Sequence, residues 1–150
     1  MAGGLGNNLA VAYLNDDHGS GTPATLYYGL LTAQPTDGDA SSLVEAAWSG
    51  YARPSLTNNG TNWPGASVVS HIAQTTSGST ASISWGTLPG GASTQVVTGL
   101  AECSSLTASF SASNMIRTAV FGTISSPVTY TLNAGASLSI PGTNLTFQQT

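Results

Sequence analysis

The chain has 150 residues and a formal net charge of −4, and only 5% of its residues are charged, whereas a typical soluble domain carries about 25%. Two arginines supply all the positive charge of Lys and Arg, which is too little to neutralise a row of phosphates or to form a polybasic membrane patch. These numbers exclude a nucleic-acid-binding protein. Serine (21), threonine (20) and glycine (18) are abundant, and so neutral a surface predicts that partner molecules cover much of it.

The N-terminal part of the chain predicts one short helix and one strong strand. Residues 1–14 are typical of a helix or helical arm, with apolar residues at four-residue intervals: Leu5, Leu9 and Tyr13. After a turn-rich break comes Thr25–Thr32 (TLYYGLLT), a run dense in β-forming residues. Ser41–Trp48 has a helical composition and predicts one or two turns of helix.

From Tyr51 onward, short β-strands alternate with turns rich in Gly, Pro and Asn. In Ser79–Leu88 the apolar residues Ala81, Ile83 and Trp85 alternate with small polar ones, as in a half-buried strand. Further strands are predicted at residues 51–57, 66–74, 94–103, 115–124, 128–132, 136–140 and 144–148. A strand about every ten residues predicts a mainly β fold. We expect one domain over residues 1–150, with the arm at 1–14 and an antiparallel β-sandwich or jelly roll at 22–150.

The residues capable of chemistry are not arranged for catalysis. Asp16–Ser20 combines acids, a histidine and a hydroxyl in one turn, where they cannot converge on a substrate, so we interpret it as a solvated turn, with a metal site as the alternative. Asp37–Asp39 resembles the start of a calcium loop, but Glu45 follows too early. His18 and His71 are too far apart in the sequence for a known zinc pattern, and Cys103 has no partner cysteine. His71 is predicted to lie in a strand. We therefore expect no enzyme activity, cofactor or metal.

Several residues are candidates for a partner interface. Arg53 and Arg117 are the only Lys or Arg residues, and each pairs with an acid of its own chain or binds a partner's carboxylate through its planar guanidinium. Trp63, beside Pro64 in a long turn, is the tryptophan expected to be exposed, with carbohydrate stacking as one alternative role. The arm is too short to be a stable helix alone, so Leu5, Leu9 and Tyr13 need a cover. We expect a partner surface, such as a sister subunit, to provide it, with the chain's own core as the alternative.

The segment Thr25–Pro54 carries a recognisable pattern: TLYYGLLTAQPTDGD, a spacer containing Glu45, and GYARP. It resembles a family of small virion proteins of tailed bacteriophages, variously labelled tail fibre, minor tail or head decoration proteins. The matching residues are Leu26, Tyr27, Leu30, Thr32, Pro35, Thr36, Asp37, Glu45, Gly50, Tyr51 and Arg53. Trp85-Gly86 and the final hairpin (NAGASLSI, then NLTFQQ) match loosely, whereas residues 55–84 depart from the pattern.

The resemblance implies a structural virion protein that assembles in the cytoplasm of a bacterial host. Within such a family, a capsid decoration (cement) protein is a small β-protein that binds the major capsid protein as a trimer and stabilises the shell. Fibres usually gain length from sequence repeats, and none is present here, so we favour a decoration protein at the capsid surface. The alternative is a minor tail or fibre-associated protein that contacts the host, including by binding carbohydrate.

Overall fold

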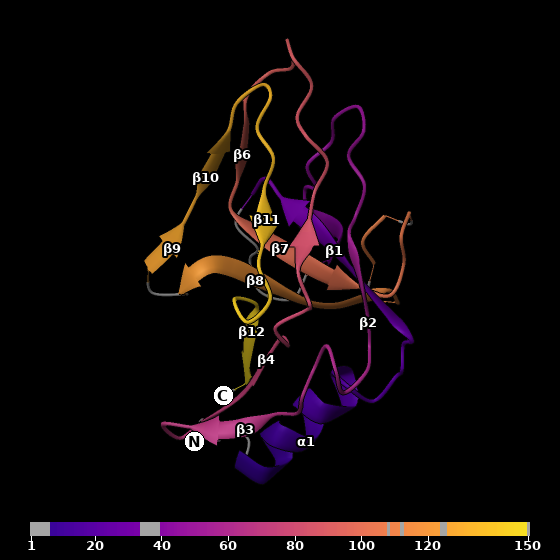
Figure 1. Ribbon diagram of the computed structural model, residues 1–150, viewed down its shortest axis with the longest axis vertical. Helices are drawn as coiled ribbons and strands as arrows, with labels where there is room; N and C mark the ends of the chain where they lie inside the picture. The colour runs from indigo at the N-terminus through magenta and orange to yellow at the C-terminus, as the bar shows by residue number, and fades with distance from the viewer. Residues whose placement is uncertain (1–6, 34–39, 108, 112, 124–125, 150) are drawn as a thin grey trace. The chain divides into compact units, whose positions relative to one another are not determined.

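The computed structural model describes residues 7–33, 40–107, 109–111, 113–123 and 126–149. Within this part of the chain, the regular structure consists of one α-helix, one 3-10 turn and short β-strands (Figure 1). The strand pairs found there are antiparallel. The predicted fold class, mainly β with antiparallel sheets and one short N-terminal helix, is confirmed.

The chain forms two compact units that are interleaved along the sequence. Unit 1 comprises residues 1–25, 56–83 and 140–150, and unit 2 comprises residues 26–55 and 84–139. These five segments alternate between the units, so the chain passes from one unit to the other four times. Three short strands lie at passages between the units: β2 (Ser55–Thr57), β5 (Ile83–Ser84) and β11 (Ser139–Ile140). No one boundary in the sequence therefore separates the two units.

Unit 1 is a helix packed on a three-stranded sheet. The helix is α1 (Asn7–Asp17), and the strands, in spatial order, are β12 (Thr146–Gln149), β4 (Ile72–Thr76) and β3 (Ser67–Val69). Ala10 and Leu14 of α1 are buried, so the inner side of the helix packs within its own unit. The helix ends three residues later than the predicted arm, and Leu5 lies outside the described residues.

A tight hairpin replaces the single strand predicted at residues 66–74. Ser70 and His71 have positive φ angles of 49° and 68°, which turn the chain between β3 and β4. Two consecutive residues with positive φ suit the right-handed twist of a two-residue hairpin. His71 is therefore an exposed turn residue, and its predicted place within a strand is wrong.

Unit 2 contains a sheet in which β1, β7, β8 and β9 are neighbours in that order. Their bounds are Thr25–Leu31, Gly99–Cys103, Met115–Thr123 and Ser126–Val128. A separate pair is formed by β6 (Gln95–Val97) and β10 (Tyr130–Leu132). β7 is buried at every position, whereas no described side chain of β8 is fully buried and all of β9 is exposed. The hydrophobic core of unit 2 therefore lies at β1 and β7. The sheet ends at the exposed edge strand β9, which we call its open end.

The helical prediction for Ser41–Trp48 is wrong. A 3-10 turn, η1, covers only Ala40–Ser42, and the chain then runs extended beside β1. The Ala46 N–H donates to the Leu30 carbonyl over 2.8 Å, and the Thr32 N–H donates to the Val44 carbonyl over 2.9 Å. These backbone bonds with β1 outweigh the weak helical preference of the segment.

Candidate functional site

Arg53 of the GYAR motif forms an ion pair with Glu45 inside unit 2. The Arg53 guanidinium donates from Nε to Glu45 Oε1 over 2.8 Å and from Nη2 to Glu45 Oε2 over 2.6 Å. Its Nη1 donates to the Ser105 carbonyl over 2.7 Å, and its Cζ atom lies 4.4 Å from the centre of the Phe110 ring. The Arg53 side chain is 4% exposed and that of Glu45 is 23% exposed. The sequence left open whether Arg53 pairs with an acid of its own chain or with a partner's carboxylate. This two-point pairing shows that its partner is Glu45 of the same chain.

Tyr51 completes this cluster by bridging it to β1. Its hydroxyl donates to Glu45 Oε1 over 2.8 Å and accepts the Leu30 N–H over 2.8 Å. The Trp48 ring packs edge-on against the Tyr51 ring at 4.7 Å. The carboxylate of Glu45 therefore accepts three hydrogen bonds from two side chains of the motif.

The local backbone explains the spacing of these residues. Glu45 forms a bridge with Leu31, and the chain then turns back at Trp48, whose carbonyl accepts the Tyr51 N–H over 3.0 Å. Gly50 takes a positive φ of 85° in this turn. Gly29 on β1 lies beneath the cluster, where a Cβ atom would come within 2.6 Å of Glu45 Oε1. The glycine leaves space for the carboxylate, which is why the strand TLYYGLL tolerates a glycine at its centre.

The ionic groups stabilise one another's charge states. The hydrogen bond with Glu45 raises the pKa of Arg53 further, so its positive charge is permanent. Burial and then the Glu45 charge raise the pKa of the Tyr51 hydroxyl, which stays protonated. Burial raises the pKa of the Cys103 thiol despite the opposing charge of Arg53. A permanently paired arginine and a protonated thiol suit a structural cluster and not a nucleophilic centre.

A fully buried carboxylate lies on β7, the strand that pairs with β1 in the same unit. Glu102 is fully buried and accepts a hydrogen bond from the Tyr28 hydroxyl over 2.9 Å. Arg117 Nε lies 3.4 Å from Glu102 Oε2, so this arginine is also paired within the chain. Sequence reasoning missed Glu102, although an acid inside the apolar run GLAEC is a signal that a partner must be present.

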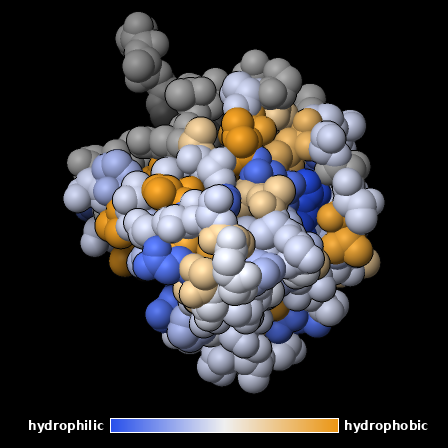
Figure 2. Space-filling view, turned by 90° about the horizontal axis from the view of Figure 1, so that it is seen from above, coloured by the Kyte–Doolittle hydropathy of each residue, from blue (hydrophilic) through white to orange (hydrophobic). Residues whose placement is uncertain are grey.

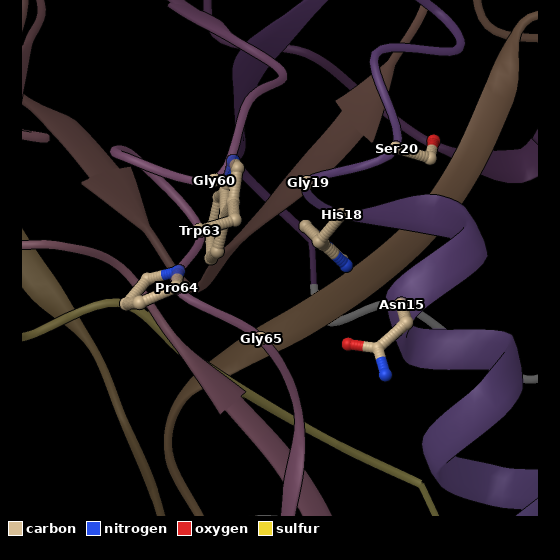
Figure 3. Close-up of a pocket in the computed structure, with 8 residues that line it drawn as sticks. All are labelled: Asn15, His18, Gly19, Ser20, Gly60, Trp63, Pro64 and Gly65. Atoms are coloured by element: carbon tan, nitrogen blue, oxygen red, sulfur yellow. The ribbon is translucent and has the colours of Figure 1, made fainter.

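Unit 1 contains a pocket of about 300 Å³ beside the end of α1 (Figure 3). Its lining residues are Asn15, His18, Gly19, Ser20, Gly60, Trp63, Pro64 and Gly65. The His18 ring lies 4.3 Å from the Trp63 ring and 5.0 Å from the Phe147 ring, measured between centroids. Asn15 already accepts the Ala66 N–H, and Ser20 donates to the Asp16 carbonyl at the end of the helix. The pocket thus combines a packed aromatic wall with polar groups that serve the local backbone.

Two predictions about this region are wrong. Trp63 is 1% exposed, so its ring packs in the core of unit 1 and cannot stack on a carbohydrate. His18 is also buried, whereas the sequence predicted a solvated turn. The aromatic packing of His18, Trp63 and Phe147 brings together three segments distant in the sequence, and local sequence features do not show such a cluster.

The candidate interface residues are therefore dispersed. Arg53 and Trp63 are buried, Arg117 is mostly buried and paired, and Leu9 and Tyr13 are exposed on α1. Of the residues considered for a calcium loop, Asp37–Asp39 lies outside the described residues, and Glu45 is ion-paired with Arg53. No cluster of three or more potential metal ligands occurs among the described residues.

The surface is poor in charge and carries exposed apolar side chains. Figure 2 shows one face, on which pale residues of intermediate hydropathy predominate and hydrophobic residues form small groups. Exposed large apolar side chains on the described part of unit 2 include Val44, Val96, Leu106, Val128 and Tyr130. Tyr130 packs edge-on against Phe121 of β8 at 5.2 Å, next to the open end of the sheet.

None of the helices in the described part of the chain has the length and apolar character needed to cross a membrane. No protein-family model matches the chain, and no curated protein matches it.

Proposed function

We propose that this chain is a structural virion protein of a tailed bacteriophage, and specifically a capsid decoration (cement) protein. In this role it binds the major capsid protein at the surface of the head and stabilises the shell. It acts as a homo-oligomer, with the trimer as the form that the family resemblance implies. It has no catalytic step.

The observation that carries the proposal is the absence of available positive charge on a surface of small neutral residues. The chain has two Lys or Arg residues, and both guanidinium groups are engaged with carboxylates of the same chain. Such a surface has little charge to oppose association and few charges to desolvate when a protein partner covers it. This favours permanent assembly with other proteins over binding of nucleic acid.

The motif residues support the same proposal in a different way. Glu45, Tyr51 and Arg53, which carry much of the family resemblance, form one hydrogen-bonded cluster with β1. Residues with this spacing thus help to hold the segment after η1 against the sheet. The resemblance therefore concerns the architecture of unit 2, the part of the chain whose sheet has an open end.

The alternative is a minor tail or fibre-associated protein that contacts the host. This alternative does not include carbohydrate binding through Trp63, because the ring is buried. Binding of this protein to the tail, at few copies per particle, would favour the alternative.

Two measurements test the location. Purified protein is mixed with expanded capsids that lack it and, separately, with tail tubes of the same phage, and each mixture is sedimented. We expect the protein to sediment with capsids, and quantitative mass spectrometry of virions to find it in a fixed ratio to the major capsid protein. Binding to tail tubes but not to capsids would refute the proposal.

A further inference from the structure

The helix α1 is apolar on its outer side as well as on its inner side. Leu9–Leu14 (LAVAYL) is an unbroken apolar run, and it includes the buried residues Ala10 and Leu14. On the outer side, Leu9 is 48% exposed and Tyr13 is 53% exposed, with the exposed Ala12 between them. A helix that is apolar all round is normally buried all round. We define Leu9, Ala12 and Tyr13 as the outer face of α1.

The strand β3, in the same unit, also carries an exposed apolar side chain, Val68. Val68 pairs with Ala73, so the two side chains are on the same side of the sheet, and Ala73 is buried there. β3 runs beside α1 (Figure 1), and the Asn15 side chain ties the helix to the Ala66 N–H at 2.7 Å. Val68 is 44% exposed, and β3 is an edge strand without a charged residue. Natural proteins usually protect an exposed edge with a lysine, a proline or a bulge.

The charges near the outer face indicate which partner it fits. Unit 1 contains no Lys or Arg, and its two acids, Asp16 and Asp17, are both in the last turn of α1. The opposite end of the helix is the positive end of its dipole. In an antiparallel pair of α1 helices, the acids of one copy approach the positive end of the other. In a parallel arrangement the acids of all copies would meet and repel.

We propose that the outer face of α1 binds the same face of a second copy of this chain, with the two helices antiparallel across a two-fold axis. Ala12 lies near the centre of this contact, where its small side chain allows the helices to approach closely. Leu9 of each copy then lies toward Asp16 of the other copy. The contact concerns the isolated chain in solution, whereas the trimer of the proposed function is the form bound to the capsid shell.

Two variants of Leu9 with opposite charges test the orientation. Leu9→Lys places a cation opposite the acids of the second copy, whereas Leu9→Glu adds a repulsive charge there. By sedimentation equilibrium we expect the full-length protein to be in a monomer–dimer equilibrium, with Leu9→Glu weakening the dimer about tenfold and Leu9→Lys weakening it less. In the monomer, by contrast, the helix dipole favours Glu over Lys at position 9, because a negative charge near the start of a helix is stabilising. Greater association of the Lys variant therefore cannot result from better helix formation.

The matched control is Leu106→Glu, because Leu106 is also 48% exposed and lies in unit 2. This variant should leave the monomer–dimer equilibrium unchanged. The proposal is overturned if the full-length protein is monomeric at all concentrations, if it forms trimers, or if the Lys and Glu variants weaken association equally. As a second readout, Ala12→Cys should give a disulfide-linked dimer on mild oxidation, and Leu106→Cys should not. Failure of Ala12→Cys to cross-link in a protein that still dimerises would also refute this contact.

Discussion

Replacing Glu45 by Gln tests whether the Arg53 cluster stabilises unit 2. The substitution keeps the size of the side chain but removes the charge that accepts three hydrogen bonds from Tyr51 and Arg53. Removing one partner of a buried ion pair costs about 3–5 kcal/mol, because the other charge is left uncompensated. Glu45 is 23% exposed, so water screens part of the effect. We therefore expect a loss of about 2–3 kcal/mol in the free energy of unfolding.

The measurement is urea-induced unfolding followed by tryptophan fluorescence. Trp48 contacts Tyr51 and so reports on this cluster. Asp16→Asn is the control, measured at a protein concentration at which the chain is monomeric, because it removes a negative charge from an exposed residue, and its effect should be within about 0.5 kcal/mol. In the double variant Glu45→Gln/Arg53→Met, the loss should be smaller than the sum of the single losses by at least about 1 kcal/mol. A loss below about 1 kcal/mol for Glu45→Gln, or additive effects in the double variant, would contradict the assigned role of the pair.

Four further predictions follow from buried residues. Gly29→Ala should destabilise the protein by about 1–3 kcal/mol, since the new Cβ would lie 2.6 Å from Glu45 Oε1, and thermal unfolding measures this loss. Burial raises the pKa of Tyr28 and Tyr51 above the ordinary 10.0, so the unfolded state releases these protons first as the pH rises. The free energy of unfolding should therefore be retained below about pH 10 and fall above it. Urea titrations at several pH values should show a smaller fall for Tyr28→Phe. Trp63→Ala should cost about 3–5 kcal/mol and Trp63→Phe clearly less, because the indole Nε1 has no hydrogen-bond partner among the described residues; equal losses in urea unfolding would contradict this packing. The Cys103 thiol, buried and with a raised pKa, should react with a disulfide reagent only after urea unfolds the protein, and fast labelling of the folded protein would be inconsistent with its burial.

The features that the sequence predicted well depend on local periodicity. Thr25–Thr32 predicted a strand, and β1 covers Thr25–Leu31. The alternation in Ser79–Leu88 also predicted burial correctly, because Ala81, Ile83 and Trp85 are buried while Ser82 and Ser84 are exposed. Alternating burial follows directly from the geometry of a strand and needs no knowledge of the partner strand.

The features that the sequence did not predict depend on contacts between distant residues. The predicted strand 94–103 is divided at Thr98, whose N–H donates to the Leu31 carbonyl, into β6 and β7 with different partner strands. The turn at Ser70-His71 contains neither Gly nor Asn, the residues that usually mark positive φ. For the candidate site, the sequence indicated that Arg53 needs a carboxylate, and only the pairing of Glu45 with β1 identifies which one.

The four passages of the chain between the units constrain how this protein can change by recombination. A single breakpoint anywhere between residues 26 and 139 divides both units, because each unit then has segments on both sides of it. Exchanging one unit for a diverged version would require a breakpoint at each passage, whereas exchanging the whole gene requires two flanking breakpoints. We therefore expect the two units to be inherited together, and engineered chimaeras that join an N-terminal half to a foreign C-terminal half to lose the cores of both units.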